Sequence, residues 1–242
     1  MASPSTIIDV VSDRFGVARA TVAMQDRMLV TSGHRQITGR GRSARSSPAD
    51  AAALILAVAA TPLSGPSVKE TATYYERYAD LVATEESGHP ASFEIKPLVH
   101  LGAGHTLHDA LAAIIAMLAG GNERASHLIE GLPEDEPEDE TSIAILVELE
   151  MPTPMARIHF QIEQRKFQWV TLDGKPHQLE FLRKAVSQMT YISRPEALEK
   201  YLETLPKLGV GLWRPSDLTQ TRKFTHETLR PVADLFRFEK MK

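Results

Sequence analysis

Arginine is concentrated near the N-terminus of the chain. Between positions 14 and 45 one acidic residue, Asp26, accompanies seven arginines: Arg14, Arg19, Arg27, Arg35, Arg40, Arg42 and Arg45. This segment carries a charge of +6, so the rest of the chain must carry −10 to give the net charge of −4. Net acidity argues against a protein that coats nucleic acid indiscriminately, but a compact basic segment indicates one contact with a polyanion. A solubilising surface arm is the simpler alternative.

The residues around the first of these arginines have the pattern of two helices joined by a short turn. Apolar residues from Ile7 to Phe15 recur at helical spacing, and Gly16 follows at the place where a left-handed residue closes a helix. We expect a helix over residues 6–14 and a second over about 18–30.

This pattern resembles the helix-turn-helix of DNA-binding regulators. The positions that carry the resemblance are Val11, Ser12, the turn glycine Gly16, Val17 and Val22. The last apolar anchor position holds Gln25 instead, and Met28 or Leu29 can take over its packing. The resemblance implies that the second helix enters the major groove of DNA.

A helical projection of the second helix separates two faces. Val22, Gln25 and Leu29 share the side that should pack inward. The opposite face carries Arg19, Ala20, Ala23, Met24 and Arg27. Alanines let a helix backbone approach a groove floor, and arginines reach base edges or phosphates. A surface helix of an unrelated bundle would have similar residues, so this interpretation stays open.

The polar, glycine-containing segment from Thr31 to Ser47 follows. Its Gly39–Arg42 run is similar to the wing turn of GntR-like winged helices. More loosely, the first sixty residues resemble small regulatory proteins of phages and mobile elements in α-proteobacteria, where an Asp-Ala-Ala helix follows such a basic run. We assign its arginines to phosphate contacts: Arg35, Arg40, Arg42 and Arg45.

Other chemistry finds little support. The chain has no cysteine, which excludes disulfides, thiolate zinc sites and a cysteine nucleophile. His100, His105 and His108 are close in sequence, but no carboxylate cluster completes a metal site, and Gly102–Gly104 is interpreted as a turn. Because no catalytic motif is present, we expect neither an enzyme nor a bound cofactor or metal.

The remaining elements predict an α+β fold. Helices are expected at Ala49–Ala60, at Val68–Ala83 and at Thr106–Ala119; the first and third begin at clear capping patterns. Alternating residues then predict a three-stranded antiparallel meander, with strands at 143–149, 156–162 and 167–172 and a break at 164–165. Further helices are expected at 179–189, from 196 to 205 and, more weakly, at 225–238.

Four regions follow from these expectations. Residues 1–61 form the helix-turn-helix unit with its basic arm, and residues 62–132 form a helical middle. Residues 133–141, with six acids between 134 and 140, form a solvated linker. Residues 142–242 form the meander and its helices. Because alternation places Phe160 on a core face, we favour packing over base stacking for the aromatic residues of the sheet. We therefore interpret this region as an oligomerisation or partner-docking module.

We therefore expect a sequence-selective double-stranded DNA-binding protein that regulates transcription or a mobile element. A homodimer or higher homo-oligomer is expected, since one reading helix gives little specificity. The alternative is a phage assembly protein, such as a small terminase-like packaging adaptor. No stretch is long and apolar enough for a membrane span and no secretory signal is visible, so we expect a cytoplasmic protein.

Overall fold

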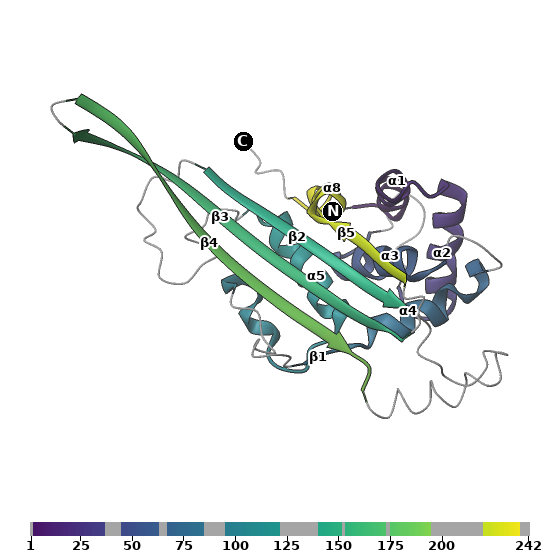
Figure 1. Ribbon diagram of the computed structural model, residues 1–242. Helices are drawn as coiled ribbons and strands as arrows, with labels where there is room; N and C mark the ends of the chain where they lie inside the picture. The colour runs from purple at the N-terminus through teal and green to yellow at the C-terminus, as the bar shows by residue number, and fades with distance from the viewer. Residues whose placement is uncertain are drawn as a thin grey trace.

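The computed structural model describes residues 2–36, 45–62, 67–84, 95–121, 140–151, 153–172, 175–194 and 220–237, and a five-stranded sheet runs through it (Figure 1). The strands lie in the order β1 (Val82–Thr84), β4 (Lys175–Ile192), β3 (Met155–Leu172), β2 (Glu140–Met151) and β5 (Gln220–Thr225). All neighbouring strands are antiparallel. The fold class is therefore α+β. β2, β3 and β4 form a three-stranded antiparallel meander, but its third strand is β4 and not the expected strand at 167–172.

The strands of this meander are longer than the sequence predicts. β3 is a single strand, so the break expected at 164–165 is wrong. β4 occupies the region where a helix was expected at 179–189, and that prediction is also wrong. β3 and β4 pair in continuous register over their whole lengths. Because this ladder supplies partners for the backbone N–H and C=O groups, it prevails over a helical spacing of apolar side chains.

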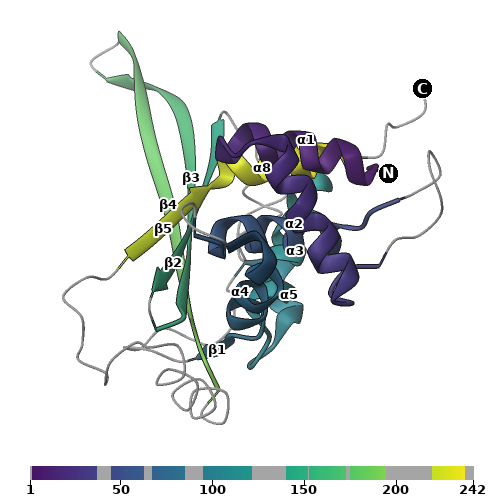
Figure 2. The ribbon, with the colours of Figure 1, turned by 90° about the vertical axis from the view of Figure 1, so that its right-hand side faces the viewer.

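Helices cover one face of the sheet (Figure 2). They are α1 (Pro4–Phe15), α2 (Arg19–Thr31), α3 (Pro48–Ala60), α4 (Thr71–Ala79), α5 (Leu107–Ala119) and α8 (His226–Asp234), with the short 3-10 helices η2 (Ser67–Glu70) and η3 (Lys96–Leu101). Buried side chains from the six α-helices and the covered face of the sheet form one hydrophobic core. In this core Phe15 of α1 packs against Phe224 of β5, with ring centroids 5.7 Å apart.

The two faces of the sheet differ as strand alternation requires. The buried residues of β2 and β3 face the helices: Ile143, Ile145, Val147, Leu149, Ala156, Ile158, Phe160 and Ile162. The other face carries charges, where Glu148 of β2 lies between His159 of β3 and Lys223 of β5. The hydrogen bond from Lys223, with a smaller one from His159, lowers the pKa of the Glu148 carboxyl.

The central helix α3 is buried from Ala51 to Ala60. Its first turn is closed by a capping box, in which the Ser47 hydroxyl accepts from the Asp50 N–H and the Asp50 carboxylate accepts from the Ser47 N–H. Its C-terminal end is capped by a residue of another element: the Arg222 guanidinium of β5 donates to the carbonyls of Ala59 (2.9 Å) and Thr61. The predicted helix 49–60 is thus confirmed.

The helix expected at Val68–Ala83 ends at Ala79, and its last residues form β1 instead. These residues add to the edge of β4, with Val82 opposite Ile192. Before this change of direction the Tyr78 hydroxyl donates to the carbonyl of Glu150 at 2.7 Å. Pairing with the end of β4 therefore makes a short strand of a segment whose apolar spacing suited a helix.

The C-terminal segment contributes β5 and α8, which starts at the capping residue Thr225. The expected helix 106–119 is observed as α5, with the predicted cap of Thr106 and Asp109. Three expectations lie outside the described residues: the wing turn at 39–42, most of the acidic linker and the helix from 196 to 205. Among the helices that the structure describes, none combines the length and apolar character needed to cross a membrane.

Candidate nucleic-acid interface and the adjoining pocket

The turn between α1 and α2 is held by local hydrogen bonds. Gly16 has a φ of 62°, which favours glycine, and its N–H donates to Asp13. The N–H of Val17 donates to the Ser12 carbonyl at 3.2 Å, and the Ser12 hydroxyl donates back to the Val17 carbonyl at 2.7 Å. These contacts use the small residue and the glycine that the sequence singled out, and they fix where α2 begins.

α2 buries one side and exposes the other, as the projection predicts. Val22 and Leu29 are fully buried, and Gln25 is 3% exposed. The opposite side is exposed at Arg19, Ala20, Met24 and Arg27 and half-buried at Ala23. Met24, at 54% exposed, is one of few large apolar side chains that the described residues present to solvent.

Gln25 occupies the position of the last apolar anchor in the helix-turn-helix pattern. Its amide oxygen is buried and has no hydrogen-bond partner among the described residues. A buried polar atom without a partner costs stability. Leu29 supplies the apolar packing beside it.

The two arginines of the exposed face differ in their surroundings. Arg19 pairs with Asp9 of α1 at 2.5 Å and donates to the Ser5 hydroxyl at 3.0 Å. All three side chains are exposed, so this pair contributes little to stability and can exchange for another anion. The Arg27 side chain makes no hydrogen bond or ion pair with the described residues, and it is exposed. It is therefore the arginine on this face that is free to reach a ligand.

Arg35 is not an exposed phosphate contact, and that prediction is wrong. Its side chain is 2% exposed and pairs with Asp26 of α2, while its Nε lies 3.6 Å from the Asp50 carboxylate. Its Nη2 donates to the Ser46 hydroxyl at 2.6 Å. Burial lowers the pKa of the guanidinium, and the charge of Asp50 opposes this effect. Arg35 therefore joins the end of α2 to the start of α3.

The other arginines assigned to phosphates lie on the same segment. Arg45 is exposed and follows directly on the residues that the structure leaves undescribed. Arg40 and Arg42 lie outside the described residues. Their assignment to phosphate contacts stays a prediction.

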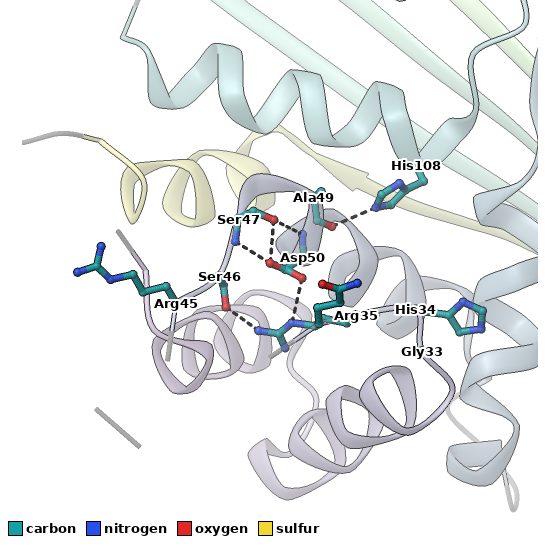
Figure 3. Close-up of a pocket in the computed structure, with 10 residues that line it drawn as sticks. Gly33, His34, Arg35, Arg45, Ser46, Ser47, Ala49, Asp50 and His108 are labelled. Carbon is teal, nitrogen blue, oxygen red and sulfur yellow. Dashed lines mark hydrogen bonds and ion pairs between the residues drawn. The ribbon is translucent and has the colours of Figure 1, made fainter. Parts of the chain in front are cut away.

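A pocket of about 570 Å³ lies between the end of α2 and the starts of α3 and α5 (Figure 3). It is lined by Gly33, His34, Arg35, Gln36, Arg45, Ser46, Ser47, Ala49, Asp50 and His108. Most of its polar groups are used by the protein itself. The capping box occupies Ser47 and Asp50, and His108 Nε2 donates to the Ala49 carbonyl at 3.1 Å. Because Arg35 is paired with two carboxylates, its charge is not available to an anion in the pocket.

Tyr75 of α4 contacts two of the histidines that line the pocket. Its ring centroid lies 5.1 Å from that of His34 and 6.2 Å from that of His108. Burial, with smaller contributions from the charges of Asp80 and Asp109, raises the pKa of the Tyr75 phenol to about 12. His34 in turn contacts the Glu76 carboxylate at 2.8 Å. These contacts join the turn after α2 to α4 and α5.

The three histidines near α5 do not come together. His105 is buried, where Nδ1 donates to the Gly102 carbonyl at 2.7 Å and Nε2 lies 2.9 Å from the Tyr191 hydroxyl. His108 faces α3, and His100 is exposed on η3. Gly102 and Gly104 both have positive φ, as expected of a turn. The described residues contain no cluster of three side chains that could hold a metal ion.

Comparison of this chain with known protein families, with curated proteins and with solved structures finds no match. The description of the protein therefore rests on its own fold: an α+β molecule with helices on one face of an antiparallel sheet, and a pair of N-terminal helices whose second member exposes a small, basic face.

Proposed function

We propose that this protein binds double-stranded DNA through the exposed face of α2 and regulates transcription or a mobile element. The observation that carries the proposal is the division of α2 into a buried side at Val22 and Leu29 and an exposed side of small and basic residues. The helix is buried deeply enough to be held rigidly. Its outward residues are the ones that a partner can reach.

The shape of this face suits the major groove. α2 has 13 residues and is therefore about 20 Å long. Ala20 and the half-buried Ala23 keep the outward surface low, so the helix can approach base edges closely. Met24 between the two arginines offers apolar contact of the kind that thymine methyl groups accept.

Neighbouring helices hold α2 in a fixed position. α1, α2 and α3 pack on one another, and the buried pair of Arg35 with Asp26 joins α2 to the start of α3. A reading helix needs such support, because base contacts depend on a fixed position of the backbone. The exposed face of α2 is thus presented by a rigid element.

The test begins with selection of bound duplexes from a random pool, followed by fluorescence anisotropy on one selected and one random duplex. The double variant Arg19→Ala/Arg27→Ala should lose discrimination between the two duplexes, because each good base contact contributes about 1–3 kcal/mol. The matched control is Lys69→Ala/Arg77→Ala, which removes the same charge from η2 and α4. Unchanged selectivity in the first variant, or an equal decrease in both, would contradict base reading by α2.

The alternative function, a DNA-packaging adaptor, makes a different prediction about assembly. Adaptors of that kind hold DNA while the chain builds a ring, whereas a regulator acts as a dimer. No contact among the described residues favours a ring. Measuring the mass of the assembly in solution distinguishes the two functions.

A further inference from the structure

The sheet has one long edge. β4 pairs with β3 along its whole length, but on its other side β1 pairs only with Thr190, Tyr191 and Ile192. No strand in the described part of the chain pairs with this edge from Lys175 to Met189, which we call the open edge of β4. At about 3.4 Å per residue the open edge is about 50 Å long.

An edge of this length is uncommon in isolated proteins. It presents a row of backbone N–H and C=O groups, which another strand can complete by hydrogen bonding. Proteins usually shorten or cover such an edge. Here the hairpin of β3 and β4 projects beyond the helices (Figure 1), and Val186 on the open edge is 61% exposed.

We propose that the open edge of β4 pairs antiparallel with the same edge of a second copy of the chain, across a two-fold axis. The two ends of the edge define the register. Pairing stops at Lys175, where the strand begins, and at Met189, beyond which β1 occupies the position. Antiparallel use of the whole segment places its midpoint, Leu182, on the axis and opposite the partner's Leu182.

Charge at the register positions agrees with this arrangement. With Leu182 on the axis, Glu180 stands opposite the partner's Lys184, and the symmetry repeats the pair. Opposite charges at directly opposed positions stabilise an antiparallel pair, and like charges destabilise it. The ends of the strand and the charges of its sequence thus agree on one register.

A second copy fits this edge better than nucleic acid does. DNA offers no peptide groups to continue a strand ladder, and the segment from Leu179 to Leu182 contains three large apolar residues. Self-association is also symmetric, as most homo-oligomeric contacts are. The inference concerns assembly only and stands whether or not α2 binds DNA.

Charge reversal tests the register on the full chain. Sedimentation or light scattering should give a dimer mass for the natural sequence. Glu180→Lys or Lys184→Glu should each raise the dimer Kd about tenfold or more, because both opposed pairs become repulsive. Mixing the two variants should restore a dimer, since every opposed pair is then attractive, and this result also shows that both variants fold. Lys166→Glu on β3 is the control and should leave the mass unchanged.

A disulfide test places the axis directly. The chain has no cysteine, so Leu182→Cys introduces a single thiol. Opposed residues in an antiparallel pair have Cα atoms about 4.5–5.5 Å apart, within disulfide range, so oxidation should give a covalent dimer. Leu179→Cys should not, because the two copies of residue 179 would lie about 20 Å apart. Three results would each overturn the proposal: a monomeric natural chain, failure of the mixed variants to associate, or equal cross-linking at 179 and 182. It would also be overturned if the hairpin variants changed DNA affinity and left the dimer Kd unchanged.

Discussion

Arg35 illustrates how the role of a residue depends on distant neighbours. In sequence it belongs to a basic, glycine-containing segment, which is typical of phosphate contacts. In the fold, Asp26 and Asp50 face it from α2 and α3, and its side chain is buried. A charge that is paired in the interior cannot serve a ligand at the surface.

Removing this buried cation should be costly. Arg35→Ala leaves the largely buried Asp26 without its partner, so we expect the free energy of unfolding to fall by about 3–5 kcal/mol in urea denaturation. Arg45→Ala removes an exposed arginine from the same segment and should change it by less than about 0.5 kcal/mol. The double variant Arg35→Met/Asp26→Leu should recover much of the stability. Equal effects of the two alanine variants would show that Arg35 is not structural.

Gln25 differs from Arg35: it is a buried polar residue that lacks, within the part of the chain that the structure describes, a hydrogen-bond partner for one of its atoms. Gln25→Leu removes the buried amide oxygen that has no hydrogen bond among the described residues. We expect the free energy of unfolding to rise by about 1–3 kcal/mol. Thermal and urea denaturation provide the measurement. A fall in stability would mean that the amide makes contacts outside the described residues.

At the scale of elements, helices with their own end signals were predictable. The capping patterns at Ser47 and Thr106 give the starts of α3 and α5 because the cap is a local interaction. The exposed face of α2 was predictable for a similar reason, since helical geometry alone separates the two faces. Arg35 was not, because its acidic partners come from two other parts of the chain.

The strands of the hairpin were harder to predict. Apolar residues between 179 and 189 recur every three or four positions, which fits a helix, and only the pairing with β3 makes this segment a strand. The dipeptide Asp173-Gly174, between two segments rich in β-forming residues, was the signal that could have revealed it. β1 and β5 are short and form only because β4 and β2 offer them an edge, so no local pattern identifies them.

Two adjacent residues of β5 allow a test at this scale. Arg222 faces the core and donates to the last carbonyls of α3, whereas Lys223 faces outward to Glu148. Arg222→Ala should lower the free energy of unfolding by about 2–3 kcal/mol, because these carbonyls then have no charged donor. Lys223→Ala should cost under about 1 kcal/mol, since its ion pair is more exposed. The reverse order, measured in urea, would show that α3 does not depend on Arg222.

At the scale of the whole molecule, seven arginines fall between positions 14 and 45, in and around α2, and Figure 1 places α2 at the opposite end of the molecule from the tip of the β3 and β4 hairpin. A dense basic segment attracts a polyanion to that part of an acidic protein. We propose that Arg40, Arg42 and Arg45 supply affinity for DNA, whereas α2 supplies selectivity.

Neutralising the basic arm should separate these two contributions. Arg40→Gln/Arg42→Gln/Arg45→Gln, with Arg35 retained, should weaken binding to every duplex alike. The slope of log affinity against log salt should flatten by about 0.9 for each phosphate that the arm no longer neutralises. Salt titrations on one selected and one random duplex provide the measurement. Coincident slopes would identify a solubilising arm, and a change only on the selected duplex would mean that the arm reads sequence.

The contact of Arg222 with α3 also bears on how the protein is made. α3 acquires its N-terminal cap from residues beside it as soon as they are synthesised. Its C-terminal carbonyls accept from Arg222, and the Ala59 carbonyl lies 163 positions before that residue in the chain. Contacts between such distant segments form late, after a large reduction in chain entropy. A nascent chain halted before β5 therefore lacks the charged donor at the C-terminal end of its central helix, and this contact forms only when nearly all of the sequence has left the ribosome.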